Sequence, residues 1–159
     1  MQVSFKQMFM RKLISAAIAT SLFSILYAWF GPDPFGDKAR FYSLSDRLHE
    51  AIGYTMIYMM YAAPAIYIYG VITSVISELI SRAATSHQWL RLVISAILHI
   101  AFGLILLYIS LLAAVLFFMA DTLLVLFRKK SYTIKYTLAS LLLPLTIWLA
   151  CLAYIHIMG

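Results

Sequence analysis

Three titratable side chains lie inside apolar stretches of this sequence, namely Glu78, His99 and Asp121. Ionisable groups inside membrane segments are costly to bury, and they usually face the interior of a helical bundle or a water-filled cavity. Carboxylates and an imidazole held together could carry protons or a cation. We therefore predict that the three form a protonatable cluster, with His99 and Asp121 within hydrogen-bonding or water-bridged distance.

A structural interpretation of the same residues also remains open. Glu78 could lie close enough to the membrane interface to be hydrated and paired with Arg82, four residues further along the same helix. His99 could be a neutral packing histidine. Asp121 could be a lone carboxylate that faces the basic residues 128–130.

Motifs for other chemistry are absent from the sequence. It contains no glycine-rich phosphate loop, no HExxH and no GxSxG, and the single Cys151 excludes an intramolecular disulfide and a CxxC zinc site. A Ser-His-Asp nucleophile stays open because serines are available, although nothing in the sequence positions one. We expect no catalytic residue, no cofactor and no metal site, and hence no enzyme.

The composition indicates a membrane protein. Hydrophobic residues make up 64% of the 159 positions and charged residues only 11%, which excludes an ordinary soluble domain. The basic residues stand in short clusters beside apolar segments, a pattern that indicates membrane orientation and attraction to anionic lipid, with no nucleic-acid partner. We predict an all-α polytopic transmembrane bundle, with residues 1–159 as one membrane domain.

The number of spans depends on residues 92–127, whose only formal charge is Asp121. As one helix this segment would be about 54 Å long, whereas a hydrocarbon core is about 30 Å thick. It is therefore either one overlong helix in a four-span bundle or a hairpin that turns near residues 107–110. The five-span prediction places the spans at approximately 13–30, 51–80, 90–106, 110–127 and 136–157.

Charge distribution favours five spans. With the N-terminus in the cytoplasm, five spans put nine of the twelve Lys and Arg residues on the cytoplasmic side, whereas four spans leave only a weak bias in either orientation. We therefore predict a multi-pass plasma-membrane protein with a cytoplasmic N-terminus. The four-span bundle with one overlong helix at 92–127 remains the alternative.

Local signals refine the first two spans. Residues 1–12 are expected to lie in the interface as a short helix, and residues 13–30 lack the small-x-small pattern of a cleaved signal peptide before Gly31. Ser45 is expected to cap a helix that begins near Asp46. Pro64 lies near the middle of the second apolar run and predicts a kink there.

Small and polar residues also recur at four-residue spacing on two neighbouring spans. Each set lies on one helical face and, counted inward from the short loop between the spans, the two sets are in register. Close approach and cross-helix hydrogen bonds are expected along such a seam. The predicted seam comprises Gly70, Ser74 and Glu78 on the second span and Ser95, His99 and Gly103 on the third.

Three short motifs carry a resemblance to a known family. They are residues 69–74 followed by an acid four positions later, residues 98–103, and residues 117–121 before a basic cluster. Across about residues 60–130 the chain resembles a family of small uncharacterised multi-span membrane proteins of Bacillus-type Gram-positive bacteria. The resemblance implies a bacterial plasma membrane and no particular activity.

Two functions are compatible with these features. The short loops and the leucine-rich and aromatic surface favour a non-enzymatic accessory, regulatory or immunity-type bundle that associates with another membrane protein or with itself in the lipid bilayer. The alternative is a small proton- or cation-coupled transporter or channel that uses Glu78, His99 and Asp121.

Overall fold

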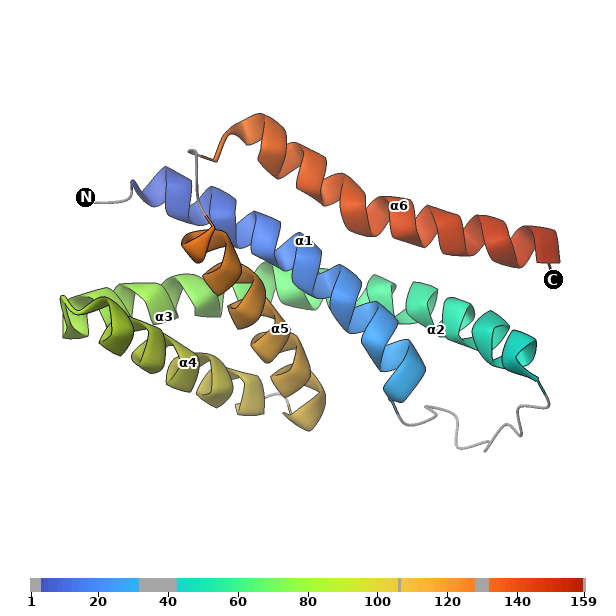
Figure 1. Cartoon of the computed structure of the whole chain (residues 1–159), viewed down its shortest axis with the longest axis horizontal. Coiled ribbons are helices and arrows are strands. Elements are labelled where there is room, and N and C mark those ends of the chain that lie inside the picture. Colours follow the sequence, from blue (N-terminus) through green and yellow to red (C-terminus); the bar gives the residue numbers. More distant parts are fainter. Residues whose placement is uncertain (1–3, 32–42, 106, 128–131, 159) are drawn as a thin grey trace.

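The chain folds as a bundle of helices (Figure 1). The computed structural model describes residues 4–31, 43–105, 107–127 and 132–158, and no strand occurs among them. The elements are α1 (Phe5–Phe30), α2 (Leu44–Ala65), the π-helical turn η1 (Ile66–Gly70), α3 (Val71–Ala84), α4 (Gln88–Ile105), α5 (Leu107–Leu126) and α6 (Ile134–Met158). The predicted all-α bundle is confirmed.

Five helices in the described part of the chain are long and apolar enough to cross a membrane. Residues 92–127 belong to two of them, because α4 ends at Ile105 and α5 begins at Leu107. The four-span alternative is therefore wrong. The break also falls earlier than the turn expected at 107–110. In place of a glycine or proline turn, the hydroxyl of Ser110 in the first turn of α5 donates to the carbonyl of Gly103 near the end of α4.

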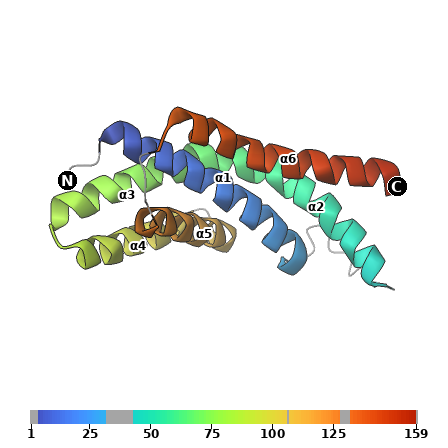
Figure 2. The ribbon, with the colours of Figure 1, turned by 45° about the horizontal axis from the view of Figure 1, so that its top comes forward.

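The overlong helix of this protein lies elsewhere. The continuous segment Leu44–Ala84 has 41 residues, which corresponds to about 60 Å of helix. It is interrupted by η1 directly after Pro64. Proline lacks an amide hydrogen and clashes with the preceding turn, so the ladder of hydrogen bonds is locally displaced. The segment changes direction here (Figure 2), in agreement with the kink predicted from Pro64.

Helix α1 forms the centre of the bundle, where it packs against α2, α3, α5 and α6 (Figure 1). Its buried residues are mostly small ones between Ser15 and Ser24, which allow neighbouring helices to approach closely. The expectation of a separate short helix at residues 1–12 is wrong from residue 5 onward, whereas its place in the membrane interface stays a prediction. The chain is one helix from Phe5 to Phe30, and Arg11 and Lys12 are buried in it.

Side chains also fix the entry to α2. The N-cap is Ser43 and not Ser45, since the Ser43 hydroxyl accepts a hydrogen bond from the Asp46 amide at 3.2 Å. Arg47 in the first turns of α2 lies over the ring of Trp29, 5.4 Å from its centroid. This contact joins the end of α1 to the beginning of α2.

The hairpin formed by α4 and α5 is shorter than its surroundings. In both views its tip ends well before the ends of α1, α2 and α6 along the long axis of the molecule (Figures 1 and 2). The hairpin therefore covers α3, η1 and the adjoining end of α2, together with part of α1. Beyond its tip, α1 and α2 lie without the cover of α4 and α5.

Candidate functional site

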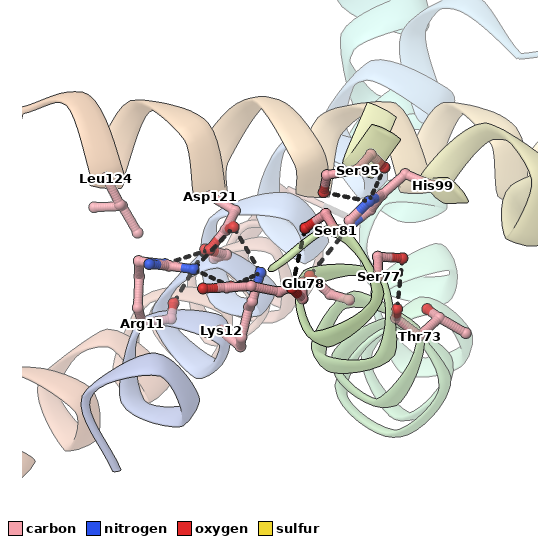
Figure 3. Close-up of polar contacts among 12 residues, drawn as sticks. Arg11, Lys12, Thr73, Ser77, Glu78, Ser81, Ser95, His99, Asp121 and Leu124 are labelled. Carbon is pink, nitrogen blue, oxygen red and sulfur yellow. Dashed lines mark hydrogen bonds and ion pairs between the residues drawn. The ribbon is translucent and has the colours of Figure 1, made fainter. Parts of the chain in front are cut away.

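Three helices bring four charged residues together at one end of the bundle (Figure 3). Consecutive residues of α1 supply Arg11 and Lys12, α3 supplies Glu78 and α5 supplies Asp121. We call these four residues the ionic cluster. Lys12 is 1% exposed and Arg11 4% exposed, so both cations lie inside the protein.

Asp121 is held by three side chains of α1. Arg11 Nε donates to Oδ1 at 2.7 Å and Arg11 Nη2 reaches Oδ2 at 3.3 Å, which is the bidentate arrangement that a guanidinium offers to a carboxylate. Lys12 Nζ donates to Oδ2 at 2.7 Å, and the Ser15 hydroxyl donates to Oδ1 at 3.3 Å. Asp121 is therefore a fully coordinated carboxylate and not a lone one.

Glu78 completes the ionic cluster from α3. Its Oε2 atom pairs with Lys12 Nζ at 2.9 Å and with Arg11, so both cations bridge the two carboxylates. Its Oε1 atom pairs with Arg82 on the next turn of α3. The pairing of Glu78 with Arg82 expected from the structural interpretation is thus confirmed, and Glu78 also reaches into the protein.

The charges of the ionic cluster balance, with two cations against two carboxylates. Burying an ion away from water costs several kcal/mol unless an opposite charge and hydrogen bonds compensate for it. Here every member has a partner of opposite sign from another helix. Chemically, this arrangement is suited to holding α1, α3 and α5 in fixed register, because each cation of α1 pairs with a carboxylate of both other helices.

His99 has partners different from the expected one. Its Nδ1 atom lies 2.7 Å from the carbonyl oxygen of Ser95, which can only accept, so Nδ1 carries a proton. Its Nε2 atom lies 3.1 Å from the Ser74 hydroxyl and can accept a hydrogen bond from it. The ring lies against Phe117 and Phe118. The hydrogen bond predicted between His99 and Asp121 is not formed, because Asp121 is bound by side chains of α1 and His99 by serines, while their water-bridged approach stays a prediction.

The predicted seam between the second and third spans is only partly correct. Ser74 and His99, which the sequence placed at equal depth, meet across α3 and α4. The glycines, in contrast, face α5. A Cβ atom on Gly103 would lie 2.9 Å from the Cβ of Ala114, and one on Gly70 would lie 3.5 Å from the Phe117 ring. The helices diverge at this level because the hairpin tip folds away.

That divergence leaves a cavity of about 430 Å³, which we call the tip cavity. It lies between α1, the region around η1, and the end of the α4–α5 hairpin. His99 lies on its wall and is hydrogen-bonded to Ser74, which precedes Glu78 by one helical turn in α3. Its walls include Tyr61, Ile66, Tyr69, Phe102, Ile109 and Phe117.

Sequence reasoning missed the cationic half of the ionic cluster. The position of Arg11 and Lys12 before the first span predicts interfacial charges that set the membrane orientation. A signal was available, since both stand at the start of an apolar run just as Glu78 and Asp121 stand near the ends of theirs. The same inward count of residues, applied also to the first span, would have placed two cations at the level of two carboxylates.

No other described group suggests bound metal or transferred chemistry. Among the residues that the structure describes, no three His, Cys, Asp or Glu side chains are placed to hold a metal ion. Cys151 is partly buried in α6, among apolar neighbours in the sequence. Comparison with protein-family models, curated proteins and solved structures finds no match to this chain, so its function must be argued from its own geometry.

Proposed function

We propose that this protein is a non-enzymatic subunit of the plasma membrane that acts by association with another membrane protein or with a second copy of itself. The observation that carries the proposal is a face of α6. Leucines at alternating spacings of four and three residues follow this face and are all exposed: Leu138, Leu142, Leu145, Leu149 and Leu152.

Spacing of this kind is the heptad pattern with which two helices interlock. In a membrane, apolar side chains gain nothing merely by leaving lipid, so association depends on close side-chain packing. A continuous ridge of one residue type offers such packing over several turns. The other side of α6 is already occupied by α1 and α2, which leaves the leucine face for a partner.

The ionic cluster supports the same proposal. Its cations and carboxylates satisfy each other within the chain, so they are suited to fixing the bundle as a rigid platform for a partner.

A rival function is a small proton- or cation-coupled transporter, and one observation favours it. His99 lines the tip cavity, and its hydrogen-bond partner Ser74 lies one helical turn from Glu78 of the ionic cluster.

A photo-crosslinking residue placed on α6 in cells tests the proposal. Substituted at Leu149, on the leucine face, it should give a discrete product of fixed mass. Substituted at Leu143, which is exposed but lies away from that face, it should give none. The product at Leu149 should be lost when Leu142 and Leu145 are both changed to alanine.

The second measurement is ion flux across liposomes that contain the purified protein. We expect no pH-dependent ion flux. Flux that is lost in Asp121→Asn, together with equal crosslinking at Leu149 and Leu143, would replace the association proposal with the transporter.

A further inference from the structure

We propose that the tip cavity is a binding site for one hydrocarbon chain of a bilayer lipid. This site is separate from the leucine face of α6 and goes beyond association with another protein. It follows from three properties of the cavity: its size, the chemistry of its wall and the medium at its mouth.

The wall of the tip cavity includes both buried and exposed side chains. Its buried side chains include Phe117, His99 and Ile66, which are 2%, 5% and 6% exposed. Its exposed side chains include Tyr61, which is 75% exposed, and Ile109, which is 37% exposed. The volume of about 430 Å³ falls within the range of about 300–1,000 Å³ that is usual for small-molecule sites.

The wall carries no charged side chain, and polar groups at its centre are engaged within the chain. No Lys, Arg, Asp or Glu is among its described residues. The Tyr69 hydroxyl donates to the Phe102 carbonyl at 2.9 Å, and the Thr73 hydroxyl donates to the Tyr69 carbonyl at 2.9 Å. Both ring nitrogens of His99 are also engaged. A charged ligand would lose its water without meeting an opposite charge here, whereas an alkyl chain has no such desolvation cost.

The mouth opens within the apolar part of the molecule. The exposed side chains of its wall belong to helices that are long and apolar enough to cross a membrane: Tyr61 lies in the Leu44–Ala84 segment and Ile109 lies in α5. In a bilayer these side chains are surrounded by hydrocarbon. A lipid chain is therefore the molecule at hand, and an empty apolar cavity would forfeit packing contacts.

The test uses the full chain in phosphatidylcholine vesicles in which a fraction of the lipid carries a diazirine on one acyl chain. After illumination, labelled peptides are mapped by mass spectrometry. We expect label on peptides that contain Tyr69 and Phe102. It should fall several-fold in Ala65→Phe, which places a ring at the exposed side of the cavity. The matched control Ala153→Phe, on an exposed position of α6, should leave it unchanged.

Equal labelling in Ala65→Phe and in the unchanged protein would overturn the proposal. A second measurement decides the question if Ala65→Phe does not fold. Ala113 lines the cavity, and Ala113→Cys in a Cys151→Ala background should resist a water-soluble maleimide in vesicles. Rapid reaction would mean a hydrated cavity and would also overturn the proposal. Neither result depends on crosslinking through α6.

Discussion

At the residue scale, the ionic cluster costs free energy to bury, but it fixes how three helices align. Three buried charges and the partly buried Glu78 are expensive to assemble, and a well-packed apolar core of the same size is often equally stable or more so. What the ionic cluster adds is a fixed alignment of α1, α3 and α5 relative to one another. Arg11 touches both Asp121 of α5 and Glu78 of α3, so a helix shifted by one turn would leave buried charges without partners.

Removal of one carboxylate should therefore be costly. We expect Asp121→Asn to lower the free energy of unfolding by about 3–5 kcal/mol, because Arg11 and Lys12 would keep their charge inside the protein with one carboxylate between them. Unfolding in mixed detergent micelles measures it. Asp46→Asn serves as the control, since Asp46 is exposed in the first turn of α2 and should change stability by less than about 1 kcal/mol.

The double variant Lys12→Met with Asp121→Asn should recover most of the loss, because it removes one charge of each sign. A double variant no more stable than Asp121→Asn alone would mean that charge balance is not what holds the cluster.

Part of the site could be predicted from sequence. Glu78 and Asp121 stood out because carboxylates are rare inside apolar runs, and Ser74 and His99 were matched by counting inward from a short loop. The partners of Asp121 could not be obtained in this way. They lie more than 100 positions away in the chain, on a helix whose place at the centre of the bundle no local pattern reveals.

At the element scale, the α4–α5 hairpin depends on the absence of a side chain at Gly103. Leu111 and Ala114 of α5 lie directly over it, with the Cα of Leu111 only 3.2 Å from where a Cβ would be. The backbones of the two helices therefore touch near the tip, which is how the chain reverses without a glycine or proline turn.

Gly103→Ala should separate the two helices and lower stability by about 1–3 kcal/mol through overpacking. Gly53→Ala is the matched control, since no atom lies within 4 Å of its Cβ position. It should be neutral or stabilising by up to about 1 kcal/mol, because alanine is the better helix former. Thermal unfolding midpoints in detergent compare them. Equal midpoints would mean that the hairpin contact is not tight.

The elements themselves were largely predictable, since apolar length and charge placement give five spans. The residues at which the helices begin and end were less predictable. The sequence predicted a second span of 51–80, but α2 and α3 with η1 extend over Leu44–Ala84, because polar residues at both ends continue the helix once Ser43 caps it.

At the scale of the whole molecule, the connections alternate between two ends. The N-terminus, the α3–α4 connection and the start of α6 lie at one end, and the start of α2 and the C-terminus lie at the other (Figure 1). Lys6, Arg82, Arg91 and Lys135 belong to the first end. We propose that this end is cytoplasmic, since basic residues accumulate on that side of a membrane.

Single cysteines at the two ends of the long helix test this orientation. In a Cys151→Ala background, Ser45→Cys should react with a membrane-impermeant maleimide added to intact cells. Ser86→Cys should react only after permeabilisation. Both positions are exposed, so access to the reagent depends on the side of the membrane and not on burial. The opposite result would invert the orientation, and equal labelling of both from outside would contradict a spanning segment between them.

The partnership of α1 with α5 also has a consequence for the order of events during synthesis. Arg11 is made 110 residues before Asp121, a delay of about 5–20 s at usual rates of translation. Throughout this interval the two cations at the start of the first helix have at most Glu78 to face. The first helix can therefore take its final central place only when the fourth span has emerged from the ribosome. A nascent chain that stalls before Asp121 carries an unbalanced charge at its centre, which distinguishes it from the finished protein.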